Sequence, residues 1–238
     1  MAAAFNLDRG QRLVIDTAQL DWLPSPAPGV WRKPLEREDV ERGQVTSIVR
    51  YDAGAGFAPH SHPNGEEILV LSGTLADDAG TYPAGTYLRN PPGSEHAPFS
   101  PRGCELLVKL NQFQPGDRLR VRIPSHAVAW QHDVEHGIEL LLLHRCGRER
   151  VRLERWPPGA RLADHIHLGG EEVWVLEGAF GDADGRYPAG CWVRLPPGSR
   201  HRPTTDQGCL LWVKSGWLGP PLDAPSNPAS NPASNPAT

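Results

Sequence analysis

Two segments of this chain repeat one pattern of glycine, histidine, glutamate and proline residues at a constant offset of 105 residues, as from His60 to His165. In the first copy the pattern extends from Gly54 to Cys104. Chance does not keep one spacing over so long a segment, so the chain contains two copies of one folded unit. A length of 238 residues then divides into two units that are each large enough to bury a core.

The boundaries of these units follow from local breaks in the sequence. We predict an N-terminal extension over residues 1–11, a first unit over 12–114 and a second unit over 115–218, with a Pro-Gly-Asp break between the units. Residues 219–238 repeat Ser-Asn-Pro-Ala and lack the apolar side chains that would offset the entropy of ordering. We therefore expect a disordered tail there.

The 25 glycines and 25 prolines interrupt the sequence too often for long helices. Between them lie short runs rich in aliphatic and aromatic residues, which are typical of strands. Short strands at this spacing predict an all-β fold, with a sandwich or barrel in each unit. The predicted strands occupy residues 47–51, 67–72, 87–90, 105–110, 151–156, 172–177, 192–195 and 210–214.

The net charge of -4, with acidic and basic residues interspersed, provides neither a basic face for nucleic acid nor a polybasic patch for a membrane. No apolar stretch approaches the roughly 18 residues of a membrane span, and the N-terminus does not resemble a secretory signal. We therefore expect a cytoplasmic protein that binds a small molecule, with a protein partner or a homodimer as further options. The four cysteines, among them Cys104 and Cys209, are expected to be reduced thiols.

Each copy contains three histidines and a glutamate at spacings that can surround a metal ion. His60 and His62 are two residues apart, so in a strand both side chains point to the same side. Glu66 follows a turn-prone Pro-Asn-Gly segment and can return on the adjacent strand, whereas His96 follows a Pro-Pro-Gly turn on a later strand. The predicted metal ligands are His60, His62, Glu66 and His96 in the first unit and His165, His167, Glu171 and His201 in the second.

Three imidazoles and one carboxylate suit iron, manganese, nickel, copper or zinc, and in an octahedral site they leave two positions open. A single His-x-His pair in a strand is more often solvent-facing or hydrogen-bonded than metal-binding. Here the pair recurs with its glutamate and its distant histidine in both copies, which favours metal binding. We therefore predict two divalent transition metals per chain, with zinc, iron, manganese and nickel as the candidates.

Charged residues beside the predicted ligands have two interpretations. Each ligand glutamate is followed by a second one, Glu67 or Glu172, and alternation along a strand allows only one of the two to face the cavity. Burial statistics favour the surface for this second glutamate over a place behind the ligands. Arg89 and Arg194 occupy repeat-related places, and a structural salt bridge, for example to Glu67 and Glu172, is favoured over contact with a substrate anion.

The remaining histidines suggest no second kind of site. His132 and His136 are four residues apart, but the zinc-protease order His-Glu-x-x-His is absent, so we expect them to face solvent. His126 and His144 belong to no motif. The eight tryptophans are expected in the core or around the cavities.

The repeated motifs have a recognisable form. The pattern G-x5-H-x-H-x3-E-x6-G begins at Gly54 and Gly159, and G-x5-P-x-G-x2-H begins at Gly85 and Gly190. Both resemble the signature motifs of the cupin superfamily. The segments Gly-Glu-Glu-Ile-Leu-Val-Leu and Gly-Cys-Glu-Leu-Leu-Val-Lys further resemble the cupin domain of ChrR-type anti-sigma factors. This resemblance covers about residues 12–218 and implies two tandem jelly-roll barrels, or double-stranded β-helices, that each bind a metal through the residues named above.

The resemblance implies two classes of function. One is a metal-dependent enzyme of the dioxygenase type, which acts on a carbonyl or phenolic compound. The other is a non-catalytic metal-dependent sensor or regulator, similar to an anti-sigma factor in an oxidative stress response. ChrR-type regulators bind their sigma factor through a separate N-terminal helical zinc domain, and only residues 1–11 precede the first unit here. A direct anti-sigma role is therefore not expected. Of the two classes of function, we favour the metal-dependent enzyme.

Overall fold

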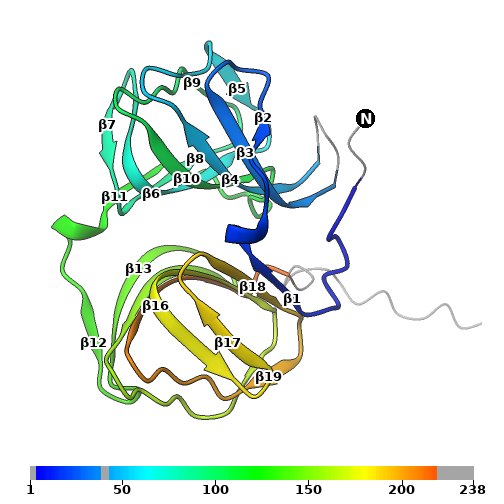
Figure 1. The fold of residues 1–238 in the computed structure, drawn as a ribbon, viewed down its shortest axis with the longest axis vertical. Helices are drawn as coiled ribbons and strands as arrows, with labels where there is room; N and C mark the ends of the chain where they lie inside the picture. The colour runs from blue at the N-terminus through cyan, green and yellow to red at the C-terminus, as the bar shows by residue number, and fades with distance from the viewer. Residues whose placement is uncertain (1–3, 39–42, 219–238) are drawn as a thin grey trace, which may run out of the picture.

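The fold is all-β, as predicted. The computed structural model describes residues 4–38 and 43–218, and in this part of the chain it has two eight-stranded antiparallel sheets, two short 3-10 turns and no α-helix. Each sheet, together with a two-stranded ribbon, forms one barrel (Figure 1). The predicted pair of tandem cupin barrels is therefore confirmed. The predicted tail, residues 219–238, lies outside the described residues.

The first sheet has the strand order β11-β8-β6-β10-β4-β3-β2, with β7 beside β6, and β5 pairs with β9 in the ribbon. These strands are β2 (Leu23–Pro24), β3 (Val30–Arg37), β4 (Val45–Tyr51), β5 (His60–His62), β6 (Glu66–Asp77), β7 (Gly80–Pro83), β8 (Thr86–Asn90), β9 (Ser94–His96), β10 (Cys104–Leu110) and β11 (Val121–Pro124). The four strands predicted in this half of the chain are present, and each is longer than predicted.

The second sheet has the equivalent order β1-β18-β16-β20-β14-β13-β12, with β17 beside β16, and β15 pairs with β19 in its ribbon. These strands are β1 (Leu13–Asp16), β12 (Gln131–Asp133), β13 (Ile138–Cys146), β14 (Glu149–Trp156), β15 (His165–His167), β16 (Glu171–Asp182), β17 (Gly185–Pro188), β18 (Cys191–Leu195), β19 (Ser199–His201) and β20 (Cys209–Ser215). The same order in both sheets is what two copies of one unit require.

The two halves of the chain exchange one edge strand. Strand β1 comes from the first half but pairs with β18, so that Leu13 lies opposite Arg194 in the sheet of the second barrel. Strand β11 comes from the second half and pairs with β8, where Val121 lies opposite Arg89 in the first barrel. Figure 1 shows β1, in blue, against the second barrel. Each barrel is therefore completed by a strand from the other half of the chain.

A glycine closes the first motif of each copy because no side chain fits there. Gly73 and Gly178 have φ angles of 69° and 68°, and a Cβ at either position would lie 2.1 Å from the carbonyl oxygen of Gly103 or Gly208. Glycine tolerates both the positive φ and the close approach. The long strands β6 and β16 can thus pass the start of β10 and β20 and continue into the hairpins with β7 and β17.

Three apolar cores hold the barrels together. One fills the first barrel around Val70 and Leu106, and a second fills the other barrel around Val175 and Leu211. The third contains residues of both halves and lies between the barrels, with repeat-related pairs in one cluster. These pairs are Leu69 and Trp174, Tyr87 and Trp192, and Leu107 and Trp212. At about 25 cal/mol per Å² and about 150–250 Å² each, a buried tryptophan contributes about 4–6 kcal/mol.

Buried ion pairs cross this third core in a reciprocal pattern. Lys109 donates a hydrogen bond of 2.7 Å to Glu172, and its repeat-related partner Lys214 donates one of 2.6 Å to Glu67. Glu67 and Glu172 are 3% and 0% exposed, so the prediction that they lie at the surface was wrong. These glutamates point out of their own barrel and would be at the surface if that barrel stood alone. In the whole chain the other barrel covers this face of the strands. Burial by itself would raise the Glu67 pKa, but Lys214 and Arg89 hold it at about 2.

The two repeat-related arginines lie in the same buried layer and are structural, as predicted. Arg89 lies 3.2 Å from Glu67, which confirms one of the suggested salt bridges, and it also bonds Asp117 at 2.5 Å. The suggested bridge from Arg194 to Glu172 is replaced by one of 2.5 Å to Glu36. Strand β3 brings Glu36 to the interface, which the spacing of the motifs could not indicate.

We expect Lys214→Met to destabilise the protein strongly. The substitution leaves the carboxylates of Glu67 and Glu149 buried without this cation, and breaking one partner of a buried pair costs about 3–5 kcal/mol. Urea unfolding measures the loss in free energy of unfolding. Arg155→Met is the control, because it breaks an exposed pair with Glu139 and should cost less than about 1 kcal/mol.

The double variant Glu67→Gln/Lys214→Met removes both charges and should be more stable than Lys214→Met alone. A Lys214→Met protein as stable as the Arg155→Met control would contradict the role given to this pair.

Candidate metal centres

The first group of predicted ligands meets at one end of the first barrel. Strands β5 and β9 pair antiparallel, with His60 opposite His96 and His62 opposite Ser94, so the three imidazoles lie on one face of the ribbon. Their ligand atoms lie within 4.8 Å of one another. The Nδ1 atom of His60 lies 2.9 Å from the carbonyl oxygen of Ala58. This nitrogen therefore carries the proton, and Nε2 is left with a free electron pair.

Glu66 adds a carboxylate to these histidines from the first position of β6. One of its oxygens, Oε2, lies 3.3 Å from Nε2 of His62 and 3.4 Å from Nε2 of His96. Asn90 of the neighbouring strand β8 donates a hydrogen bond of 2.8 Å to the same oxygen. The carboxylate is thus held toward the imidazoles, and the four residues predicted for the first unit come together.

The spacing and protonation of this group fit a divalent metal ion. Nε2 of His62 and Nε2 of His96 are 2.9 Å apart, close to the roughly 3 Å between neighbouring ligands that each lie about 2.1 Å from one ion. Burial and the nearby His60 lower the pKa of His62 to about 4, and burial lowers the pKa of His96 as well. Both rings are therefore neutral near pH 7, which is the form that binds metals.

The second barrel brings its four predicted residues together in the same way. His165 lies opposite His201 in the β15–β19 ribbon, and the ligand atoms of His165, His167 and His201 also lie within 4.8 Å of one another. Oε2 of Glu171 lies 3.5 Å from Nδ1 of His167. The Nε2 atoms of His167 and His201 are buried and have no hydrogen-bond partner among the described residues, a state that a bound metal would relieve. These donors fit the same kind of ion.

An aspartate behind the last histidine of each group orients that ring. Nδ1 of His201 lies 3.0 Å from Asp182, and Nδ1 of His96 lies 3.5 Å from Asp77. Burial alone would raise the pKa of Asp182, but hydrogen bonds from Arg12, His201 and Tyr187 lower it to about 2. The two aspartates were not predicted as functional residues, although they also keep the offset of 105. Carboxylates in this position fix the ring and its tautomer in metal sites.

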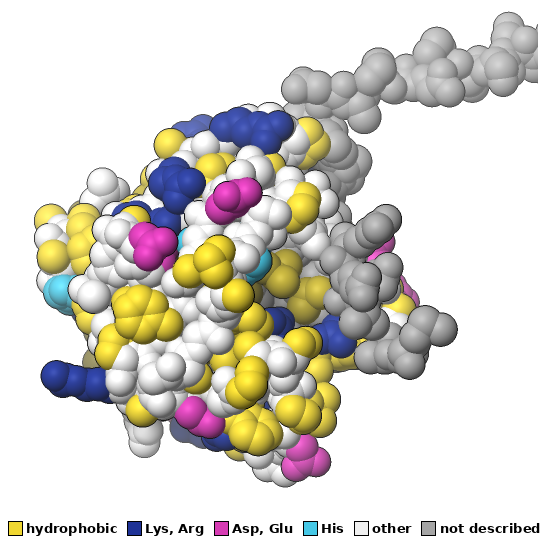
Figure 2. Space-filling model, turned by 90° about the horizontal axis from the view of Figure 1, so that it is seen from above, with side chains coloured by type: hydrophobic (Ala, Val, Ile, Leu, Met, Phe, Trp, Pro, Cys, Tyr) yellow, Lys and Arg dark blue, Asp and Glu magenta, His cyan; other side chains and the backbone are white. Residues whose placement is uncertain are grey.

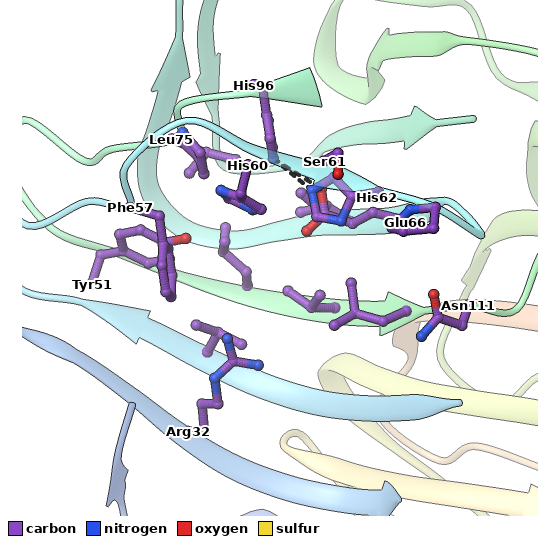
Figure 3. Close-up of a pocket in the computed structure, with 17 residues that line it drawn as sticks. Arg32, Tyr51, Phe57, His60, Ser61, His62, Glu66, Leu75, His96 and Asn111 are labelled. Carbon is purple, nitrogen blue, oxygen red and sulfur yellow. Dashed lines mark hydrogen bonds and ion pairs between the residues drawn. The ribbon is translucent and has the colours of Figure 1, made fainter. Parts of the chain in front are cut away.

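The two groups differ in the space beside them. The cavity next to the first group has a volume of about 230 Å³, whereas the one next to the second has only about 40 Å³. Figure 3 shows the first cavity, with the histidines on one wall and the aromatic rings of Tyr51 and Phe57 at one side. Figure 2 views the molecule from the end that carries the β5–β9 ribbon, where histidine side chains reach the surface among hydrophobic ones.

Charged side chains from β14 fill the second cavity. Arg152 and Glu154 line it and lie 2.5 Å apart, and Arg152 also lies 3.4 Å from Glu171. The repeat-related residues of β4 are Ser47 and Val49, which are smaller and uncharged. The second site is therefore closed by an internal ion pair, and the first is open.

A third cluster of ligand-type residues does not resemble the other two. Asp117, His144 and Glu149 are all buried, with ligand atoms within 4.8 Å of one another. Arg89 bonds Asp117, and Lys214 lies 3.4 Å from Glu149, so protein cations already neutralise these carboxylates. His144 thus belongs to the buried network between the barrels, although it lies in no sequence motif.

The other structural predictions can be checked directly. His136 is exposed and bonds the Asp133 carboxylate at 2.9 Å, as expected for a solvent-facing histidine. The four cysteines are free thiols. Within the described residues, no helix is long and apolar enough to cross a membrane.

The fold and the two histidine groups define a bicupin. The ChrR cupin-like domain family matches residues 10–114 and again residues 119–219. The chain therefore belongs to the ChrR cupin-like family, in two copies. A comparison with curated proteins gives no match.

Solved structures similar to this chain are also cupins or proteins of the same fold. A putative dioxygenase from Nostoc punctiforme has a TM-score of 0.73 at 20% identity, with 89% of this chain and 85% of that chain covered. The pirin YhhW of Escherichia coli, in complex with nickel(II), has a TM-score of 0.65 at 13% identity, with 86% and 98% covered. Oxalate decarboxylase from Lactobacillus farciminis has a TM-score of 0.63 at 12% identity, with 86% of each chain covered. At these identities the similarity establishes the fold.

We expect Asp182→Asn to weaken metal binding at one of the two sites. An amide in place of the carboxylate holds the His201 ring less firmly, and loss of such a partner typically costs 10–100-fold in metal affinity. A competition titration of zinc against a chromogenic chelator should show one weakened equivalent and one unchanged. Asp206→Asn, at an exposed position, is the control. Two unchanged equivalents in Asp182→Asn would count against the orienting role.

Proposed function

We propose that each barrel binds one divalent transition metal and that the first barrel is the substrate site of a metal-dependent enzyme of the dioxygenase type. The ligands are His60, His62, Glu66 and His96 in the first barrel and His165, His167, Glu171 and His201 in the second. The open cavity beside the first group carries this proposal, because three imidazoles and a carboxylate leave coordination positions for a small molecule to reach.

The residues of the first cavity supply the other requirements of such a site. When bound, the metal would act as a Lewis acid and, if it is iron, as a centre for dioxygen chemistry. Ile68, Leu75 and Leu106 form an apolar floor, and Tyr51 and Phe57 form an aromatic wall, so the cavity favours an organic ligand over bulk water. A volume of about 230 Å³ lies below the roughly 300–1,000 Å³ of sites for drug-sized ligands. The substrate is therefore small.

The second barrel is proposed to bind its metal without a substrate. The ion pair between Arg152 and Glu154 occupies the space that a ligand would need. Its metal would then stabilise the β15–β19 ribbon, since binding to the folded state alone adds to stability. The two sites thus divide into one for chemistry and one for structure.

Elemental analysis tests the number of metals. After metal supplementation we expect about two equivalents per chain, and His60→Ala/His62→Ala should lose one of them while the other stays. His165→Ala/His167→Ala is the matched variant of the second barrel. Fewer than about one equivalent in the unaltered protein would refute the two-site proposal.

Dioxygen uptake by the iron-loaded protein tests the catalytic role. We expect uptake with at least one member of a panel of diketones, catechols and hydroxyacetophenones. His60→Ala/His62→Ala should abolish this uptake, whereas His165→Ala/His167→Ala should retain it. Uptake that depends on the second barrel would contradict the assignment of the substrate site.

A non-catalytic sensor is the second candidate, and one feature of β6 favours it. Glu66 faces the metal group, and the next residue, Glu67, bonds Lys214 in the buried layer between the barrels. A ligand that moved Glu66 would therefore act on the contact between the barrels. The absence of uptake on the whole panel, with metal-dependent binding to a protein partner, would favour this sensor.

A further inference from the structure

An arginine faces the open cavity from the wall opposite the histidines. Arg32 lies on β3, opposite Val49 of β4 in the register of the sheet, and both line the cavity. Figure 3 shows its guanidinium group directed into the cavity, toward the side on which His60 and His62 lie. The wall opposite the histidines and Glu66 is mostly apolar and aromatic, and Arg32 adds one cation to it.

No carboxylate of the described residues contacts this cation, although Glu66 of the same cavity acts on it through space. Its Nε donates to the hydroxyl of Ser25 at 3.3 Å, and no described carboxylate forms an ion pair with it. Burial lowers the pKa of Arg32, which shows that the charge has lost water without a full replacement. An arginine remains charged at any ordinary pH, so the cost of its partial desolvation is permanent.

The second barrel, which has the smaller cavity, differs from the first at this position. Leu140 occupies the place of Arg32, since it lies opposite Glu154 in the sheet as Arg32 lies opposite Val49. The arginine of that barrel, Arg152, is paired with both Glu154 and Glu171. Only the barrel with an open cavity leaves its arginine without a carboxylate among the described residues.

We propose that Arg32 anchors a carboxylate of the small molecule that the first barrel binds. The substrate class is then small carboxylic acids with a second oxygen or nitrogen donor that faces His60, His62 and His96. This inference rests on the proposed function of the first barrel, because it names the ligand of that site. Arginine suits the role, since its planar fork can bond both carboxylate oxygens.

Arg32 and the histidine group share one aromatic neighbour in the cavity, the ring of Phe57. The Cζ atom of Arg32 lies 5.8 Å from the centre of the Phe57 ring, and the His60 ring centre lies 5.6 Å from the same point. The Phe57 ring is therefore a neighbour of both the Arg32 guanidinium and the His60 imidazole. Because Glu66 brings a negative charge to this cavity, an acid needs Arg32 as well as a metal to offset the repulsion.

Isothermal titration of the zinc-loaded full chain tests the anchor. The probes are lactate, pyruvate and 2-hydroxybenzoate, each compared with its own uncharged amide. We expect at least one acid to bind more tightly than its amide, and Arg32→Met to weaken that acid by about tenfold to a hundredfold, the effect of losing a charged hydrogen-bond pair. Arg32→Lys should recover part of the affinity. Arg50→Met on the neighbouring strand, whose side chain packs against Trp22, should bind as the unaltered protein does.

Thermal unfolding without ligand separates binding from structure. If Arg32 only stabilised the fold, Arg32→Met would lower the unfolding temperature, whereas an unpaired cation predicts a temperature equal to or above that of the unaltered protein. Elemental analysis of the same samples reports on the metal independently. Normal metal content, with equal acid affinity in Arg32→Met and the unaltered protein, would overturn the anchor alone.

If elemental analysis finds no bound metal in the unaltered protein after zinc loading, the proposed function is wrong instead. In that case the acids should still bind through Arg32, but more weakly than to a metal-loaded protein. Arg32→Met should abolish this weaker binding. If no acid binds more tightly than its amide at millimolar concentration, the inference is wrong.

Discussion

The reciprocal ion pairs between the barrels are the constraint on which the rest of the structure depends. A lysine at the end of each repeat donates to a buried glutamate of the other, from Lys109 to Glu172 and from Lys214 to Glu67. A buried charge that loses its partner costs several kcal/mol. The two pairs lie at repeat-related positions of the interface, so a displacement of one barrel against the other would break both, while the tryptophan-rich core between the barrels adds hydrophobic stabilisation.

The exchanged strands extend this constraint to the metal groups. Arg122 on β11 donates a hydrogen bond of 2.6 Å to Asn90, which in turn donates to Glu66 of the first barrel. Arg12, just before β1, lies 2.8 Å from Asp182, which orients His201 of the second barrel. Each candidate metal-binding group is therefore supported by a side chain from the other half of the chain. Folding of the two halves and assembly of the two sites are thus linked.

The two groups of three histidines and a glutamate, and eight of the strands, could be predicted from the sequence because their signals are local and occur twice. The burial of Glu67, Glu172 and His144 could not be predicted, because whether an outward-facing side chain is buried depends on what covers the sheet. The exchange of β1 and β11 had no signal either, since an edge strand of a given pattern fits either barrel. Asp77 and Asp182 could have been found, because they keep the repeat offset.

Alternation along one pair of strands explains how the two barrels can differ without loss of their contact. On β4, Ile48 belongs to the core between the barrels, whereas Val49 belongs to the interior of the first barrel. On β14, the equivalent Leu153 keeps the contact between the barrels, whereas Glu154 lines the small second cavity. Interior positions can therefore change from open to filled while the interface positions stay apolar. A duplicated barrel with this geometry can keep both groups of three histidines and a glutamate and still leave one of the two cavities open.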